Sequence, residues 1–473
     1  MAYDVVVVGG GIGGLTVAAL LSARGLSVCL LERQSQVGGC VGRIELDGYD
    51  FDPGMGLYLD WGPGEIYDQI FSELPVQRPA AVRLEADYVV RLPDRTDIRL
   101  RENNTAFAEE IAAAFPECSK AAIDFYDLVK QTNEQPVRSP SSAFGRALKR
   151  FWTRHHTEPD QSTLAFLGHT STRFQRFIDA QLRAFLHSSI ESCAFVTACQ
   201  ALTIPRLPRY AIDKGISFLA ERLADGIKQA GGVVRLNSPA LRLTFDENGI
   251  ASGVDLLNGE TVGAKRAIIS NLTIWDTYGK LVGLNRTPAD IKSWLSKIDA
   301  KGAYLIYAAL EDAAYSRLPS SEFLVAQERS SDENEVSELT ISVGKPADDG
   351  KRPVTIKTLT PVAPWFSFQT SEEDYEEWDQ TALGQVWEKL HEGVPELGAA
   401  IEVIESANPR TFYDTTRRKL GMVMGVEPVQ IAKPVGSNTI YPNVFLVGDT
   451  ATSGFGISSV ARSALNLANH LTK

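Results

Sequence analysis

Two groups of glycines and carboxylates, at opposite ends of the chain, have the spacing expected of residues that bind a dinucleotide. Near the N-terminus, Gly9, Gly11 and Gly14 form G-x-G-x-x-G directly after the apolar residues 5–8. The first glycine permits a tight turn, the second lets the backbone approach a pyrophosphate, and the third brings a helix close to a strand. Glu32 follows at the distance from which a carboxylate accepts hydrogen bonds from ribose hydroxyls. These residues predict a site for a dinucleotide.

The other end of the chain indicates which dinucleotide is bound. Residues 444–447 form an apolar, strand-like run that ends in Gly448 and Asp449, and a helical pattern begins near Ile457 after the loop that ends at Gly456. A carboxylate at the end of a strand can accept hydrogen bonds from a ribityl chain, and the N-terminus of the helix beyond it can stabilise negative charge on a reduced flavin. A nicotinamide cofactor has no ribityl chain. The second group of residues therefore favours FAD over NAD.

The elements that position the first group alternate between strand and helix. After the apolar run, the pattern predicts a helix from Ile12 to about residue 23, with Gly25 as its stop, and a second strand at residues 28–31 that ends at Glu32. Farther along the chain we expect a helix over residues 218–229 and a hairpin that turns at residues 258–259. The fold class is therefore α/β, with a Rossmann-like FAD-binding domain.

The domain arrangement follows from the separation of the two groups. Some 390 residues lie between them, and both must meet on one cofactor, so the chain is expected to pass between two domains more than once. We assign residues 1–75, 206–275 and 406–473 to the FAD-binding domain. Residues 76–205, expected to be mostly helical, and 276–405 form an interleaved substrate-binding domain of mixed sheet and helices, with strands expected at 303–310, 323–326 and 354–359.

Further motifs resemble those of a known family. The runs at residues 38–43 (GGCVGR) and 48–54 (GYDFDPG) are similar to the GG…G-[YF]-x-F-D-x-G pattern of the phytoene desaturase and carotenoid isomerase family, within the flavin amine oxidase superfamily. The similarity continues, in the family's order, at residues 208–215, 231–237, 408–411 and 448–456. The resemblance thus extends over the whole chain, most closely at its two ends.

The motifs and the resemblance together imply a set of cofactor-binding residues. The N-terminal members would hold the ADP half of FAD, Ala240 would present a backbone group to the adenine, Asp449 would contact the ribityl chain, and Ile457 would face the flavin pyrimidine. The double glycine would pass near the pyrophosphate, and Gly54 would lie near the ring. The full set comprises Gly9, Gly11, Ile12, Gly13, Gly14, Glu32, Arg33, Gly38, Gly39, Cys40, Arg43, Gly54, Ala240, Gly448, Asp449, Gly456 and Ile457.

The chain departs from the family pattern near the expected position of the flavin ring. Many relatives carry arginine directly after the double glycine, where this chain has Cys40, and the nearest arginine is Arg43. Met55 stands where the family often has proline, and Ser453 replaces the usual proline before the last glycines. Cys40 has two interpretations: it tethers the flavin covalently, or it is a small buried apolar side chain.

The resemblance implies an FAD-dependent oxidoreductase that acts on a polyene or other apolar isoprenoid-like substrate, by desaturation or by flavin-dependent isomerisation. Two alternatives are a flavin oxidase of amines or of a natural-product intermediate, and a prenyl- or lipid-binding chaperone without redox chemistry. We find no catalytic triad or metal site in the sequence and assign no catalytic side chain. This suits a reaction in which the flavin carries the hard step and the protein places the substrate.

Composition excludes several other classes. The net charge of −12 argues against general nucleic-acid binding. The five cysteines are scattered without a C-x-x-C pair, which suits a reducing compartment rather than a zinc site or a disulfide framework. No apolar run approaches the roughly 20 residues that span a bilayer. We therefore expect a cytoplasmic protein, soluble or peripherally bound to a membrane.

One segment departs from the acidic composition. Residues 138–156 contain basic but no acidic side chains, and helical spacing would place Phe144, Leu148, Phe151 and Trp152 opposite the basic face. This pattern is typical of a helix that lies on an anionic membrane. The alternative is a helix whose apolar face packs into the protein and whose basic face is solvated.

Overall fold

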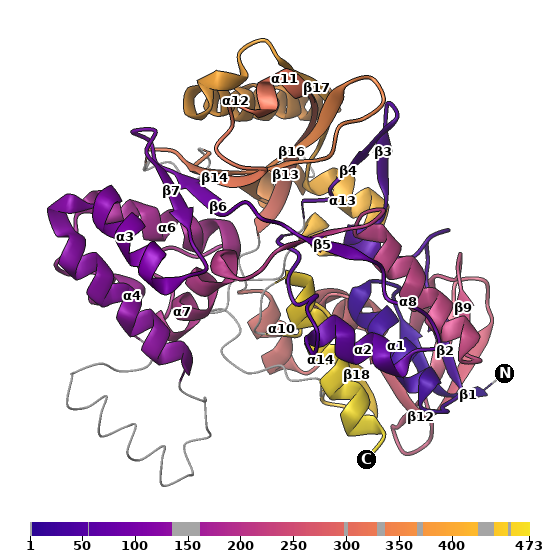
Figure 1. Cartoon of the computed structure of the whole chain (residues 1–473). Helices are drawn as coiled ribbons and strands as arrows, with labels where there is room; N and C mark the ends of the chain where they lie inside the picture. Colours follow the sequence, from indigo (N-terminus) through magenta and orange to yellow (C-terminus); the bar gives the residue numbers. More distant parts are fainter. Residues whose placement is uncertain are drawn as a thin grey trace, which may run out of the picture.

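Two seven-stranded sheets, with helices packed against them, form the part of the chain that the computed structural model describes (Figure 1). The described residues are 2–54, 56–134, 161–297, 301–328, 336–366, 372–423, 439–452 and 456–473. Both termini lie near the first sheet.

The first sheet contains the predicted strand–turn–helix unit. Its strand order is β10-β11-β12-β1-β2-β9, and β18 pairs with β12. Strands β1, β2, β9, β12 and β18 run parallel to their neighbours in this set, while β10 and β11 form an antiparallel edge. The bounds are β1 (Ala2–Val8), β2 (Val28–Leu31), β9 (Val233–Arg235), β10 (Ala240–Phe245), β11 (Ala251–Leu256), β12 (Thr261–Ser270) and β18 (Val444–Leu446).

Both faces of this sheet are buried, which explains the continuous apolar run of β1. Val5 and Val7 pack into one hydrophobic core, and Val6 and Val8 pack into another on the opposite face. On the first of these faces, α1 (Ile12–Ala23) packs between α8 (Ser217–Gln229) and α14 (Gly456–Leu471). Residues 12–22 of α1 are all buried, so the helix is apolar on every side.

The second sheet takes its strands from two separate parts of the chain. Its order is β17-β13-β16-β15-β14-β6-β7, with only the β14–β6 pair parallel. Alternate residues of β14 contribute to different cores, because Leu324 packs towards the helices α3, α4, α6 and α7, whereas Phe323 packs towards α12. The strands are β6 (Tyr88–Arg91), β7 (Asp97–Leu100), β13 (Lys301–Glu311), β14 (Glu322–Ala326), β15 (Glu338–Val343), β16 (Lys351–Pro361) and β17 (Ile401–Ala407).

The helices of this part form two layers, one on each face of the second sheet, and short elements connect the two sheets. The longer helices are α3 (Asn104–Ala114), α4 (Ser119–Glu134), α6 (Thr172–Leu186), α7 (Phe195–Thr203) and α12 (Glu372–Gly393). The remaining elements are α2 (Ile66–Glu73), α9 (Ile274–Asp276), α10 (Ala289–Leu295), α11 (Asp312–Tyr315), α13 (Pro409–Thr416), β3 (Ile44–Leu46), β4 (Tyr49–Phe51), β5 (Ala81–Arg83) and β8 (Tyr210–Ile212).

The α/β class and the Rossmann-like unit predicted from the sequence are confirmed. Helix α1 ends two residues before Gly25, and the hairpin of β11 and β12 turns at residues 258–259. The expectation that residues 76–205 are mostly helical is wrong for their first part, because β5, β6 and β7 precede the helices and β6 and β7 join the second sheet. The predicted basic helix at 138–156 lies outside the described residues. The two-domain division and its bounds remain a prediction.

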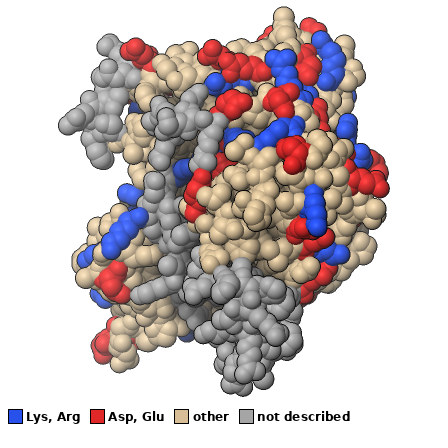
Figure 2. Space-filling view, turned by 90° about the vertical axis from the view of Figure 1, so that its left-hand side faces the viewer, with Lys and Arg blue, Asp and Glu red and all other residues tan. Residues whose placement is uncertain are grey.

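No helix in the described ranges is both long enough and apolar enough to cross a membrane. None of the five cysteines, all of which are described, forms a disulfide. Figure 2 shows acidic and basic side chains intermixed over the upper part of one face, so the charges there are not separated into a single-sign surface.

Candidate functional site

A cavity of about 460 Å³ lies at the carboxyl ends of the parallel strands β1, β2, β12 and β18, the edge at which α/β sheets bind ligands. It brings together segments from the beginning, the middle and the end of the chain. The predicted residues that line it are Gly9, Gly11, Ile12, Gly13, Glu32, Arg33, Gly38, Gly39, Cys40, Ala240, Gly448, Asp449, Gly456 and Ile457.

Three predicted residues do not line this cavity. Gly14 lies in α1, where an added Cβ would come 2.1 Å from the carbonyl oxygen of Gly9. The side chain of Arg43 is 54 % exposed and forms ion pairs with Glu45 and Asp50. Gly54 lies against the second sheet, where an added Cβ would come 2.7 Å from a methyl group of Leu305.

The first turn of α1 offers backbone N–H groups to an anion. The helix begins after Gly11, which has no side chain to cap it, so the N–H groups of the first turn are available to a ligand. Gly38 crosses this turn and donates its N–H to the carbonyl oxygen of Gly10 at 2.8 Å, with φ at +116°. The double glycine is thereby held beside the helix N-terminus.

Backbone N–H groups hold the carboxylate of Glu32 in place at the end of β2. Its carboxylate accepts the N–H of Gly10 at 2.6 Å and the N–H of Gln34 at 2.7 Å, and the residue is only 7 % exposed. Ser238, which also lines the cavity, donates its N–H to the carbonyl oxygen of Glu32 at 2.8 Å. This bond places the start of β10, with Ala240, beside the same end of the cavity.

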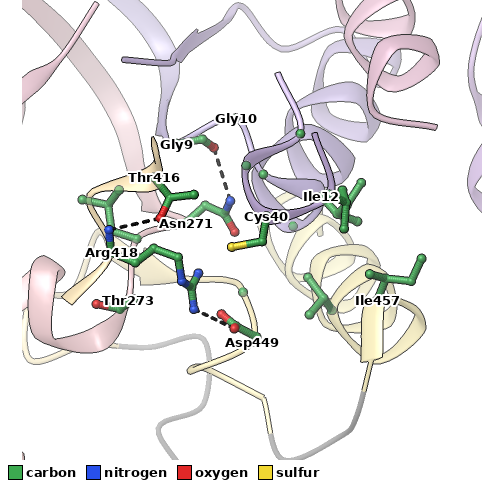
Figure 3. A pocket seen from close by; sticks show the side chains of 18 of the residues that line it. Gly9, Gly10, Ile12, Cys40, Asn271, Thr273, Thr416, Arg418, Asp449 and Ile457 are labelled. Atoms are coloured by element: carbon green, nitrogen blue, oxygen red, sulfur yellow. Dashed lines mark hydrogen bonds and ion pairs between the residues drawn. The ribbon is translucent and has the colours of Figure 1, made fainter. Parts of the chain in front are cut away.

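Asn271 is a site residue that the sequence motifs do not identify. It follows the last residue of β12, and its amide N–H lies 3.4 Å from the carbonyl oxygen of Gly9 (Figure 3). A Cβ added to Gly11 would come 2.7 Å from Asn271 Nδ2, and one added to Gly13 would come 2.8 Å from Oδ1. The amide therefore fills the space that these two glycines leave open. The signal for it was its position at the end of a strand next to β1.

Arg418 and Asp449 form an ion pair in the wall of the cavity, with 2.6 Å between Arg418 Nη2 and Asp449 Oδ2 (Figure 3). Cys40 lies close to both. Burial raises the pKa of the Cys40 thiol, against the opposing effect of the Arg418 charge, so the thiol is neutral. Arg418 was not part of the predicted set, because nothing in its local sequence marks it.

A group of buried polar side chains lies next to apolar residues that line the cavity. Phe185 and Leu186 line the cavity, and the next residue, His187, is 6 % exposed and adopts a left-handed conformation with φ at +59°. Burial, together with the nearby charges of Lys357 and Lys301, lowers the pKa of His187 to about 3. No sequence motif marks His187.

Lys357 and Asp52 are two further buried titratable groups in this region. Burial lowers the pKa of Lys357 to about 8, although the charge of Asp52 opposes the shift. Burial also raises the pKa of Asp52, whose carboxylate accepts a hydrogen bond from the Tyr58 hydroxyl at 2.5 Å and another from the N–H of Gly54 at 2.7 Å. A lysine with this pKa can exchange a proton near neutral pH.

Comparison with known proteins agrees with the site. The family model described as an NAD(P)-binding Rossmann-like domain matches residues 7–74. The chain is 24% identical to the chloroplastic prolycopene isomerase of Daucus carota, over 99% of this chain and 80% of that protein. It is 25% identical to the neurosporene-forming phytoene desaturase of Cereibacter sphaeroides, over 97% of this chain and 92% of that protein.

Solved structures share the fold. A triple mutant of putrescine oxidase superposes with a TM-score of 0.68 at 15% sequence identity, covering 99% of this chain and 98% of that chain. The resemblance to the phytoene desaturase and carotenoid isomerase family, first inferred from the motifs, is confirmed by the sequence relatives, and the fold is shared with putrescine oxidase.

Proposed function

We propose that this chain is an FAD-dependent oxidoreductase that acts on a polyene or other apolar isoprenoid-like substrate, by desaturation or by flavin-dependent isomerisation. One observation carries the proposal: two half-sites some 390 residues apart in the sequence line a single cavity. The relatives named as an isomerase and a desaturase support this function over amine oxidation and over lipid carriage without redox chemistry.

The residues of the cavity fit FAD. The uncapped start of α1 offers backbone N–H groups to a diphosphate. Glu32 would accept from the ribose, and Asp449 from the ribityl chain. Arg33 also lines the cavity, and its buried Nη1 has no hydrogen-bond partner among the described residues, so a polar group of the adenosine half would satisfy it.

FAD, when bound, would supply the redox chemistry, and the chain's own residues would exclude water and orient the substrate. Apolar side chains from three separate segments line the cavity, and these are Leu57, Leu59, Phe185, Leu186 and Ile204. Such a surface suits a hydrocarbon chain, because burial of apolar area is the main source of affinity for a ligand without polar groups.

We also propose that residues 138–156 contact a lipid surface, from which an apolar substrate would enter. Their basic and aromatic composition supports this proposal.

The first test is an absorbance spectrum of the purified protein, repeated anaerobically with dithionite. Flavin bands that bleach on reduction are the expected result, and phytoene, a cis-polyene and an amine would then be offered in turn and their products separated. Hydrogen peroxide released with the amine alone would favour an amine oxidase. A colourless protein that takes up no FAD would contradict the proposal and favour a lipid-binding chaperone.

A further inference from the structure

The turn after the double glycine lacks a positive charge where a diphosphate is expected to pass. Cys40 occupies this position with a neutral thiol, and the nearest arginine in sequence, Arg43, points into solvent and pairs with Glu45 and Asp50. The backbone N–H groups of α1 alone would face two negative charges. A second source of positive charge within the cavity would therefore strengthen the binding of a dinucleotide.

Arg418 places a guanidinium beside Cys40 from a distant part of the chain. Its side chain is 16 % exposed, lines the cavity, and is held at two points: Nε donates to the carbonyl oxygen of Met422 at 2.6 Å, and Nη2 pairs with Asp449. Burial alone would lower the pKa of Arg418, but the charge of Asp449, its hydrogen bond to Arg418 and the other acidic groups nearby together outweigh burial and raise the pKa, so the group stays charged. Among the described residues, these bonds leave the N–H groups of Nη1 available to a ligand.

The backbone around Arg418 is built to hold this position. Helix α13 has a capping box at Asn408 and ends at Thr416, and the φ of +56° at the next residue, Arg417, turns the chain back towards the cavity. Gly421 has φ at +60° and packs so closely on Pro409 that an added Cβ would overlap its carbonyl group. The loop that carries Arg418 therefore packs against Pro409, the first residue of α13.

The other basic side chains in the cavity wall are less suited to the diphosphate. Lys280 is 55 % exposed and pairs with Asp276 at 2.7 Å, and Arg417 is 47 % exposed and pairs with Asp414 at 2.9 Å. Arg33 lies next to Glu32, at the end of the cavity assigned to the adenosine half. Arg418 alone among these four lies beside both the double-glycine turn and Asp449.

We infer that Arg418 binds the diphosphate of the dinucleotide, opposite the N-terminus of α1, and that its ion pair with Asp449 orients the carboxylate that receives the ribityl chain. This inference rests on the proposed function, since it takes FAD as the ligand. Arg418, which follows α13, would thus supply the positive charge that the turn at Cys40 lacks.

The test compares two flavins that differ by the ADP group, which carries the diphosphate and which only FAD has. FAD and riboflavin are titrated into flavin-free protein and followed by quenching of flavin fluorescence, for wild type, Arg418→Met, Arg418→Lys and the matched control Arg43→Met. Arg418→Met should weaken FAD binding by roughly tenfold to a hundredfold, the range expected for a lost hydrogen bond to a charged group. Riboflavin binding should fall clearly less than FAD binding, because riboflavin loses only the orientation of Asp449, and Arg43→Met should bind both ligands as wild type does.

Three outcomes would overturn the inference. Equal losses for FAD and riboflavin would show that Arg418 acts only through Asp449, because both ligands carry the ribityl chain. Unchanged FAD binding by Arg418→Met would exclude any role, and an equal loss for Arg43→Met would show a nonspecific effect of charge. If Arg418→Met melts well below wild type, Arg418→Lys decides, since it keeps the charge and should lose FAD affinity only in part. Wild-type protein that binds neither flavin would instead remove the proposed function itself.

Discussion

Replacing Gly14 by alanine tests whether the cavity depends on close packing of α1 against β1. An added Cβ would lie 2.1 Å from the carbonyl oxygen of Gly9, whereas an unstrained carbon–oxygen contact is about 3.3 Å. The contact is with backbone, so no side chain can rotate away, and the helix has to retreat by about 1 Å. Overpacking of this kind costs about 1–3 kcal/mol of stability. It also moves the N–H groups that we assign to the diphosphate, so FAD affinity should fall as well.

Thermal denaturation of the flavin-free protein and an FAD titration measure the two effects separately. Gly384→Ala is the matched control, because Gly384 is exposed in the middle of α12 and an added Cβ there has no described atom within 4 Å. That substitution should stabilise the helix by about 0.5–1 kcal/mol and leave FAD affinity unchanged. A Gly14→Ala protein that melts and binds FAD like wild type would refute the packing argument.

Three further predictions follow from the site and its surroundings. Glu32→Ala should weaken FAD binding by about tenfold, because it removes the ribose acceptor and leaves two buried N–H groups without their partner, which a fluorescence titration would detect; wild-type affinity would refute the assignment. The pKa of His187 is lowered to about 3, so the stability that its neutral form contributes is complete above the unfolded-state pKa of about 6.5 and is lost as the pH falls towards 3. The melting temperature of His187→Gln should therefore fall less than that of wild type between pH 7 and pH 4, and parallel curves of melting temperature against pH would contradict this. Changing Phe151 and Trp152 to serine should abolish flotation of the protein with anionic liposomes, and unchanged flotation would exclude lipid contact through this segment.

The local elements of the first sheet could be predicted because their signals are local. The glycine spacing, the apolar run before it and the stop at Gly25 each constrain the few residues around them, and the structure has the strand, turn and helix in those places. The strands β6 and β7 were missed for the opposite reason. β6 pairs with β7 locally, but its other partner, β14, lies more than 200 residues later, so the segment alone gives little sign that this hairpin belongs to a larger sheet.

The same distinction explains which side chains of the cavity could be identified. A glycine motif can be recognised from sequence because the residues that let the backbone approach the ligand are those of the turn itself. Asn271 and Arg418 act on those glycines and on Asp449 from other segments, and their contacts exist only after β12 has paired with β1 and after the loop beyond α13 has folded back. The departure at Cys40 was the one local sign that a charge had to come from elsewhere. A missing residue in an otherwise complete motif therefore suggests a compensating side chain elsewhere, but only the folded chain shows that Arg418 lies in the cavity wall and that the nearer Arg43 lies outside it.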